Sequence, residues 1–336
     1  MIISMTPLRV SFFGGGTDYP EHFSRHGGAT LGSSINKYLY VTVNPLAEFF
    51  DHRIRVGYSK TELCRDVDEI QHPSVRECLR FMGIAHGIEI TVVSDLPART
   101  GLGSSSSFTV GLLHALHAFK GEMVSRERLA AEAVHVEREL IGERVGLQDQ
   151  YLCGCGGFLH MGFNGTGQVT IAPVTIPGER LRALEERLMM FYTGLQRPAH
   201  EVLERQIERT KAGEITPGLL QLHQLVGEGL AALSSDRDLS CFGELLHRGW
   251  ELKRQFSEAV SNQSIDDAYA QARRAGAVGG KLLGAGGGGF LLLYVEPDDQ
   301  TSVRNVLHDM REVDFEFENQ GSRLIFYRPV AGWTHP

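Results

Sequence analysis

Glycine is gathered into short runs in this chain, and those runs constrain the backbone more than any other feature of the sequence. The chain has 39 glycines among 336 residues, roughly 12% against an average near 7%. They concentrate at 14–16, in a G-L-G sequence at 101–103, and at 279–289. Glycine allows positive φ angles and a close approach of the backbone to a ligand or to another segment. We therefore expect these runs to mark binding loops or tight bends between packed elements.

Charge and hydropathy exclude several classes of protein. The formal net charge is −8, so no overall positive field exists to hold a nucleic acid or an anionic membrane. The strong apolar run at 290–295 is far shorter than the ~20 residues of a membrane span. The five cysteines are an odd number without a secretory signal, which favours reduced thiols. We expect a cytoplasmic protein that binds neither nucleic acid nor a membrane. The sequence leaves open whether the chain forms a homodimer.

The residue pattern predicts strands and helices that follow one another without strict alternation. Beyond Pro177 the chain becomes mostly helical up to the last glycine run, and strands return after it. This order favours an α+β protein of two domains over a doubly wound sheet. The boundary is predicted near residue 180, which gives domains at 1–180 and 181–336. The expected strands cover 1–13, 38–43, 54–58, 88–95, 156–163, 168–176, 188–193, 290–295, 313–318 and 323–328, and the expected helices cover 104–120, 125–141, 198–212, 217–234, 238–260, 264–276 and 300–311.

A glycine- and serine-rich segment at 97–107 follows a predicted strand and opens a predicted helix. Free N–H groups at a helix start bind anions, glycines let the backbone approach the ligand, and serine hydroxyls add donors. A glycine turn with serine N-caps is the structural alternative, but four consecutive serines exceed what one cap needs. The segment therefore predicts a phosphate site. Its members are Pro97, Gly101, Leu102, Gly103, Ser104, Ser105, Ser106 and Ser107.

The last glycine run contains the pattern G-x-G-x-x-G from Gly284 to Gly289, but its surroundings contradict a dinucleotide-binding fold. That fingerprint needs a strand before it and a helix after it, whereas this run precedes the strand predicted at 290–295. A phosphate loop of the Walker type is excluded as well, because Lys281 lacks a following Ser or Thr. A tight bend would explain one or two glycines, but not eight between 276 and 289.

Two carboxylates are candidates for chemistry. Glu137 lies on the helix predicted over 125–141, and Asp149 lies in a short segment beyond the end of that helix. Phosphoryl transfer uses one carboxylate for a metal and one for the proton of the attacking hydroxyl. Taken singly, each carboxylate is better explained as a solvated surface charge. Their spacing in the sequence does not show that they lie close together in the fold.

Three ordered segments resemble the motifs of the GHMP kinases, the family of galactokinase, homoserine kinase, mevalonate kinase and phosphomevalonate kinase. The first is PLRVSFFGGGTDY at 7–19, the second is the segment at 97–107, and the third covers 281–290. The spacing of the elements agrees over nearly the whole chain. Within the family the chain is similar to the kinases of D-glycero-D-manno-heptose 7-phosphate in bacterial surface-polysaccharide pathways, where a GGGTD run replaces galactokinase's G-E-H-T-D and the sequence QDQY at 148–151 is also similar.

The resemblance implies the two-domain GHMP kinase fold. Its N-terminal domain would be ribosomal-protein-like and its C-terminal domain ferredoxin-like, with ATP and the second substrate in the cleft between them. The segment at 101–107 would wrap the ATP phosphates, and Gly286 and Gly287 of the third motif would also lie at the nucleotide. Ser105 and Glu137 would hold Mg²⁺.

The resemblance also implies roles for residues near the transferred group. Asp149 would orient or deprotonate the sugar hydroxyl. Arg9 would keep Asp149 ionised and would steady the transferring phosphoryl group. Asp18 would accept hydrogen bonds from sugar hydroxyls, and its neighbour Thr17 would join it at the substrate.

Substrate size is implied by a departure from galactokinase. Gly15 and Gly16 stand where galactokinase has Glu and His, which removes two polar contacts and opens volume. A bulkier or already phosphorylated sugar therefore fits better than galactose. A phosphate on the sugar would need a basic group, and Arg197 is the candidate, because a strand is predicted to end there and Pro198 to open a helix.

We therefore expect an ATP- and Mg²⁺-dependent kinase that phosphorylates a sugar or sugar phosphate, with the anomeric hydroxyl of D-glycero-D-manno-heptose 7-phosphate as the first candidate. A kinase for a fucose- or galactose-like sugar stays open, as does a homologue that binds sugar and ATP without turnover. The presence of Arg9, Glu137 and Asp149 argues against the second alternative. The Thr17-Asp18 pair argues against the family's diphosphomevalonate decarboxylase branch.

Overall fold

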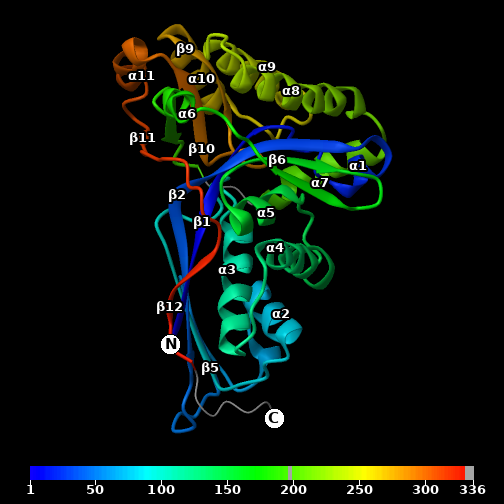
Figure 1. Ribbon diagram of the computed structural model, residues 1–336, viewed down its shortest axis with the longest axis vertical. Coiled ribbons are helices and arrows are strands. Elements are labelled where there is room, and N and C mark those ends of the chain that lie inside the picture. Colours follow the sequence, from blue (N-terminus) through cyan, green and yellow to red (C-terminus); the bar gives the residue numbers. More distant parts are fainter. Residues whose placement is uncertain (196–198, 330–336) are drawn as a thin grey trace.

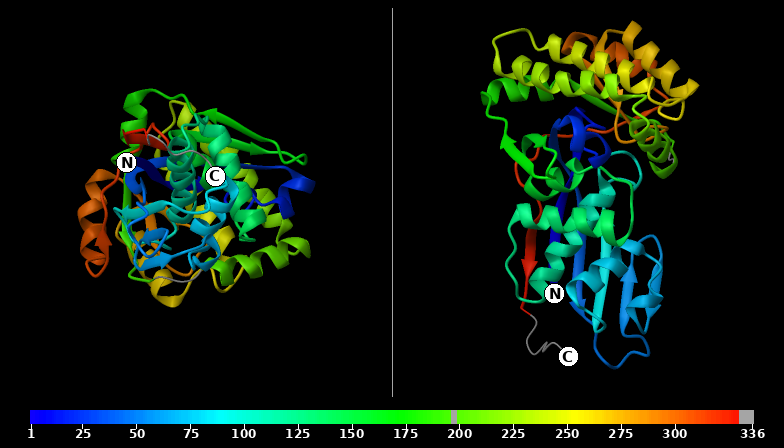
Figure 2. Two further views of the ribbon diagram at one scale, coloured as in Figure 1. Left: turned by 90° about the horizontal axis from the view of Figure 1, so that it is seen from below. Right: turned by 90° about the vertical axis from the view of Figure 1, so that its right-hand side faces the viewer.

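A large mixed sheet with helices on one face forms the longer part of the molecule, and a smaller sheet with its own helices is stacked on one end (Figures 1 and 2). The structure is a computed structural model that describes residues 1–195 and 199–329. Within the described residues, no helix is both long and apolar enough to cross a membrane.

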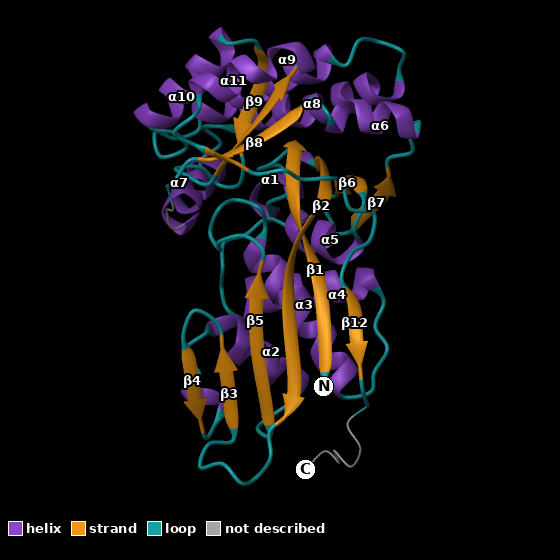
Figure 3. Ribbon diagram, turned by 90° about the vertical axis from the view of Figure 1, so that its left-hand side faces the viewer, coloured by secondary structure: helices purple, strands orange, loops and turns teal. Residues whose placement is uncertain are grey.

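The large sheet is built around two long antiparallel strands, β1 and β2, and the whole of β1 pairs with residues 31–43 of β2 (Figure 3). The first half of β2 pairs with β6 and its second half pairs with β5, so the sheet divides at the middle of β2. The strand order is β12-β1-β2-β5-β3-β4, and β7 continues from β6. The strands are β1 (Ile2–Phe13), β2 (Gly28–Pro45), β3 (Ile54–Gly57), β4 (Thr61–Cys64), β5 (Ile88–Ser94), β6 (Phe158–Phe163), β7 (Val169–Pro173) and β12 (Arg323–Tyr327).

Helix α3 (Ser104–Phe119) packs directly on β1 and β2 and is almost entirely buried, because its sequence is apolar or small on every side. Helices α2 (Pro73–Met82) and α4 (Arg126–His135) pack against α3. The chain continues from α4 into one π-helical turn, Val136–Leu140. Two short helices, α1 (Pro20–His26) and α5 (Gln148–Cys155), lie near the end of the sheet that meets the second domain (Figure 1).

The smaller sheet has the order β11-β8-β10-β9, and every neighbouring pair is antiparallel. Numbered along the chain, this is the order 4-1-3-2 of a ferredoxin-like sheet, with helices between its first and second and between its third and fourth strands. The α+β class and the ferredoxin-like second domain are thus as expected. The elements are α6 (Gly178–Glu185), β8 (Leu188–Tyr192), α7 (Ala199–Lys211), α8 (Thr216–Ser234), α9 (Ser240–Arg254), α10 (Gln263–Arg274), β9 (Ala277–Leu282), β10 (Phe290–Val295), α11 (Gln300–Val306) and β11 (Arg311–Glu312).

Several predicted elements differ from the observed ones. The prediction of a strand at 313–318 is wrong. The observed strand β11 covers only Arg311–Glu312, and Phe317 forms an isolated bridge to Ile35. Residues 277–282 form strand β9, although their glycines indicated a bend. Asp149, expected in a short segment beyond the helix predicted at 125–141, lies on the short helix α5. Short elements such as α1, α6 and β4 were not predicted, because their sequences are too short to show a period, and the longer helix α2 was not predicted either.

The two domains share one hydrophobic core at the end of β1. The rings of Phe12 and Phe13 lie 5.4 Å and 5.0 Å from the ring of Phe242 on α9, measured between centroids. Both phenylalanines belong to a buried cluster that also contains residues of α8 and β10. From β9, the ammonium group of Lys281 donates to the carbonyl oxygens of Ser11 and Phe12 at 2.7 Å and 3.0 Å. The first glycine run therefore begins at the junction of the domains.

Candidate active site

A bidentate ion pair joins β1 to α5 at this junction. The Nε and Nη2 atoms of Arg9 donate to the two carboxylate oxygens of Asp149 at 2.7 Å and 2.5 Å. The remaining Nη1 atom donates to the carbonyl oxygen of Gly101 at 2.6 Å. Burial opposes the charge of Arg9, but the adjacent Asp149 outweighs this effect and raises the pKa of the guanidinium group. The Arg9 side chain is 5% exposed and that of Asp149 is 27% exposed. The buried guanidinium therefore holds the carboxylate, which solvent can still reach.

The loop after β1 is shaped by its own backbone contacts. Gly14 has a φ of 79°, and a Cβ atom there would lie 1.9 Å from the carbonyl oxygen of Ala29. The hydroxyl of Thr17 is buried and bonds to the backbone oxygens of Gly14 and Ala29. Thr17 therefore holds the shape of the loop.

Asp18 is buried at the end of this loop and has no cationic partner within the described residues. One carboxylate oxygen accepts from the N–H of Gly16 at 2.9 Å and the other from the N–H of Gln148 at 3.3 Å. Burial and, to a lesser degree, the charge of Asp149 raise the pKa of Asp18. Two carboxyl groups of the predicted site thus lie near each other, one paired with arginine and one held by N–H groups.

Gly15 and Gly16 differ in what surrounds them. A side chain at Gly15 would meet only the ends of Gln148 and Ser11, at 3.6 Å and 3.7 Å. At Gly16, where φ is 104°, a Cβ atom would lie 2.9 Å from the Nε2 atom of Gln206 on α7. The side chain of Gln206 is buried, and its amide forms no hydrogen bond within the part of the chain that the structure describes. A polar group from the second domain therefore occupies the space beside Gly16.

The glycine- and serine-rich segment forms the start of α3 as expected. Gly103 is the N-cap with a φ of 73°, and a Cβ atom there would lie 2.9 Å from Cγ of Arg9. The first helical bond runs from the N–H of Ser107 to the oxygen of Gly103, so the N–H groups of Ser104, Ser105 and Ser106 precede it and are available to an anion. Leu102 is buried, and its carbonyl oxygen accepts from the N–H of Arg9, whereas Pro97 is exposed in the preceding loop.

The last glycine run connects β9 to β10 and packs backbone to backbone on the second motif. A Cβ atom at Gly284 would lie 2.5 Å from Cα of Gly101, and one at Gly289 would lie 2.2 Å from the oxygen of Thr100. These contacts explain why side chains are absent. Gly286 and Gly287, predicted to lie at the nucleotide, pack on the backbone of Val260.

Known proteins share this arrangement. Residues 72–157 match the GHMP kinases N terminal domain and residues 228–313 match the GHMP kinases C terminal domain. Together the two matches cover just over half of the chain. The chain belongs to the GHMP kinase family. It is accordingly an ATP-dependent phosphotransferase that acts on a hydroxyl group.

Individual relatives cover nearly all of this GHMP kinase. The D-glycero-alpha-D-manno-heptose 7-phosphate kinase of Campylobacter jejuni is 27% identical over 95% of this chain and 97% of its own. The bifunctional fucokinase/GDP-fucose pyrophosphorylase of Arabidopsis thaliana is 25% identical over 93% of this chain, which spans 32% of that longer protein. The crystal structure of a D-glycero-D-manno-heptose 1-phosphate kinase from Bacteroides thetaiotaomicron has a TM-score of 0.77 at 24% identity, over 98% of this chain and 100% of that one.

Glu137 of the kinase is fully buried on the π-helical turn and points to the start of α3. One carboxylate oxygen accepts from the hydroxyl of Ser106 at 3.0 Å and from the amide of Gln150 at 2.5 Å. The other is buried without a hydrogen bond within the described residues. Burial raises the pKa of Glu137 to about 7. The serine bonded to Glu137 is therefore Ser106, while the neighbouring Ser105, expected to share a metal with Glu137, has an exposed side chain.

Two lysines at the site were given no role by sequence reasoning: Lys281 was named only as the first residue of the third motif and in excluding a Walker-type loop, and Lys253 was missed. Lys281 reaches across from β9, and Lys253 near the end of α9 donates to the carbonyl oxygen of Gly284. A single lysine on a helix or strand shows no pattern that separates it from a solvated charge.

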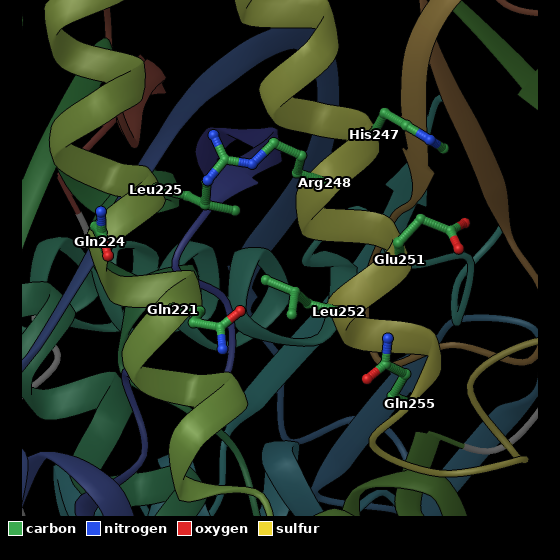
Figure 4. A pocket seen from close by; sticks show the side chains of 8 residues that line it. All are labelled: Gln221, Gln224, Leu225, His247, Arg248, Glu251, Leu252 and Gln255. Atoms are coloured by element: carbon green, nitrogen blue, oxygen red, sulfur yellow. The ribbon is translucent and has the colours of Figure 1, made fainter.

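Not every predicted or visible feature belongs to this site. Arg197, the predicted contact for a remote phosphate, lies outside the described residues. A groove between α8 and α9 is visible on the second domain, and none of the predicted site residues lines it (Figure 4).

Proposed function

We propose that this kinase transfers the γ-phosphoryl group of ATP to the anomeric hydroxyl of D-glycero-D-manno-heptose 7-phosphate. One observation carries the proposal: Asp149 is held by both arms of Arg9, directly beside the turn at Gly101 that leads into the start of α3. The proposal is supported by this carboxylate, which a guanidinium orients next to a backbone suited to phosphates.

The residues would divide the reaction among them. The N–H groups at the start of α3 would bind the ATP phosphates, and Asp149 would accept the hydrogen bond of the attacking hydroxyl and then its proton. Because both carboxylate oxygens of Asp149 already accept hydrogen bonds from Arg9, Asp149 would orient the hydroxyl more than it would act as a strong base. Asp18 would accept a hydrogen bond from another hydroxyl of the sugar.

The metal site fits a hard divalent cation. Glu137 has a buried carboxylate oxygen without a hydrogen bond in the described residues, and Mg²⁺ usually takes only one or two protein carboxylates. Glu137 would hold the ion together with Ser105, whose exposed hydroxyl is one residue before the one bonded to Glu137. When bound, Mg²⁺ neutralises charge on the ATP phosphates.

The choice of sugar rests on similarity and on the space beside the first motif. The relative from Campylobacter jejuni is named for a heptose 7-phosphate. Gly15 leaves room for a larger sugar, whereas the room expected at Gly16 is taken by Gln206 and Leu219. Arg197 stays the proposed contact for the sugar's own phosphate. A fucose-like sugar is the alternative, since the Arabidopsis relative includes a fucokinase.

The direct test measures ADP release with ATP, Mg²⁺ and a panel of sugars: heptose 7-phosphate, the unphosphorylated heptose, mannose, fucose and galactose. Phosphorus NMR of the product identifies the phosphorylated hydroxyl. We expect the highest kcat/KM with heptose 7-phosphate and an anomeric phosphate as product. A higher kcat/KM with fucose would replace the proposed substrate.

The catalytic assignment is tested by Asp149→Asn. We expect kcat to fall by about 10²–10⁴-fold, the range for a positioned acid–base group, while the Kd for ADP, measured by calorimetry, stays within a few-fold. Asp267→Asn is the matched control, because Asp267 is exposed on α10. Near-normal turnover in Asp149→Asn would remove Asp149 from the mechanism. ATP binding by wild-type protein without turnover of any sugar would favour a non-catalytic homologue.

A further inference from the structure

Lys253 brings a positive charge to the junction of the three motifs although it belongs to none of them. It is half-buried near the C-terminal end of α9, and its ammonium group donates to the carbonyl oxygen of Gly284. The adjacent Arg254 is paired with Glu251 and Asp266. Within the described residues, Lys253 has no carboxylate in salt-bridge contact.

The position of the ammonium group follows from a chain of contacts. Gly284, which Lys253 binds, packs directly on Gly101. Gly101 in turn accepts from Arg9, and Arg9 holds Asp149. Lys253 and Arg9 therefore bind the carbonyl groups of two glycines that touch each other, one in the third motif and one in the second.

The electrostatic surroundings of Lys253 favour the binding of an anion. The charges that act on it are the cations Arg9 and Lys281 and the carboxylates Asp18 and Asp149. Arg9 already neutralises Asp149, and Lys281 is bound to backbone oxygens. Of the charges named, Asp18, which is held by backbone N–H groups, is left to balance these cations, so a further negative charge beside Lys253 is favourable.

We propose that Lys253 is a further catalytic residue that contacts the phosphoryl group as it passes from ATP to the acceptor hydroxyl. This inference rests on the proposed function for the identity of the acceptor. In the step, the hydroxyl oxygen forms a bond to the γ-phosphorus, and the bond from that phosphorus to the bridging oxygen of ADP breaks. The hydroxyl proton passes to Asp149. Lys253 stays protonated and offsets charge on the phosphoryl oxygens.

The pH dependence of the reaction follows from the same surroundings. Burial, followed by repulsion from Arg9, lowers the pKa of Lys253 to about 8, against the opposing effect of Asp18 and Asp149. Above that pH the free kinase loses the positive charge, so kcat/KM, which reports the free enzyme, is expected to fall. In Lys253→Arg the guanidinium stays protonated, and the fall should move to higher pH.

Two variants and a control separate catalysis from structure. Lys253→Met removes the charge and keeps the length of the side chain, Lys253→Arg keeps the charge, and Arg254→Met changes the neighbouring cation that is paired on the helix. We expect Lys253→Met to lower kcat by about 10²–10³-fold, as for loss of one electrostatic contact to a transition state. Lys253→Arg should stay within about tenfold of wild type and Arg254→Met within about twofold, as expected for exposed ion pairs.

A binding measurement makes the test independent of the sugar. ADP with aluminium fluoride mimics the phosphoryl group in transfer, and calorimetry compares its Kd with that of ADP alone. We expect the fluoride complex to bind wild-type kinase and Lys253→Arg more tightly than ADP, and Lys253→Met to lose most of this difference at an unchanged Kd for ADP. If wild-type kinase binds the mimic but phosphorylates no sugar, the proposed substrates fail and the role of Lys253 stands. If Lys253→Met keeps the difference, or if it loses ADP binding and thermal stability together, Lys253 is only a support for Gly284 and the inference is wrong.

Discussion

Glu137 combines full burial with a carboxylate oxygen that lacks a hydrogen bond in the described residues, and such an atom favours a cation. Glu137→Gln keeps the shape and the bond from Ser106 but removes the charge. We expect the Mg²⁺ concentration for half-maximal activity to rise by about tenfold or more, the loss usual for a weakened metal site. Calorimetric titration of Mg²⁺ into the complex with ADP provides a reading without turnover.

Glu139→Gln is the control for this prediction, because Glu139 is exposed two residues further along the same turn. Its Mg²⁺ titration should match that of wild-type protein. If Glu137→Gln also gave the wild-type titration, Glu137 would be a structural residue of the turn.

Single residues were predictable where the sequence carried a motif and not where the role depends on packing. The sequence singled out Arg9 and Asp149, and the structure brings these residues together across 140 positions. Their roles remain predictions. Lys253 and Gln206 could not be found in this way, because each is one polar residue on an amphipathic helix. Only the contact of α9 with Gly284, or of α7 with Gly16, separates them from solvated side chains.

Long helices were predicted well, whereas strand β9, whose glycines make room for a neighbouring helix, was not. Helix α3 was expected at 104–120 and begins and ends within one residue of that range. Strand β9 was missed because Gly279 and Gly280 lower its strand propensity. Gly279 allows the close packing of α9 on the strand, because a Cβ atom at this position would lie 1.8 Å from the carbonyl oxygen of Gly243 on α9.

Helix α7 is the element that brings the second domain to the proposed sugar site, through Gln206 beside Gly16. We expect Gln206→Ala to raise the KM for the sugar by about 3- to 10-fold with little change in kcat, which corresponds to the loss of one neutral hydrogen bond. Steady-state kinetics with the sugar varied and ATP saturating measures this effect.

Gln224→Ala is the matched control, because Gln224 lines the outer groove on α8 (Figure 4). It should leave both constants unchanged. An equal effect of the two glutamine variants, or a change in the KM for ATP with Gln206→Ala, would argue against a sugar contact from α7.

At the scale of the whole molecule, the chain crosses between its domains more than once. Strand β12, close to the C-terminal end of the described chain, returns to the large sheet and pairs with β1. A strand can be predicted from its residues, but its partner depends on pairings across more than 300 positions, which a local pattern does not contain. The shared core at the other end of β1 also joins distant segments, because α8, α9 and β10 pack there on Phe12 and Phe13 and Lys281 bonds to the same strand.

This shared core predicts that the two domains unfold together. Phe242 of α9 is fully buried against Phe12 and Phe13 of β1, so its truncation removes packing from both domains. We expect wild-type protein to show a single calorimetric transition, although multidomain proteins often show more than one. Phe242→Ala should lower the free energy of unfolding by about 3–5 kcal/mol, as for other buried phenylalanines, and should keep a single transition.

Phe49→Ala is the control, because Phe49 is 98% exposed, and its effect should stay within about 0.5 kcal/mol. A Trp333→Phe variant leaves Trp250, buried in the second domain, as the single tryptophan of the chain. Its fluorescence should follow the same curve as the loss of total secondary structure measured by circular dichroism. Two separate transitions in wild-type protein, or non-coincident curves from the two probes, would show that the core at the end of β1 does not couple the domains.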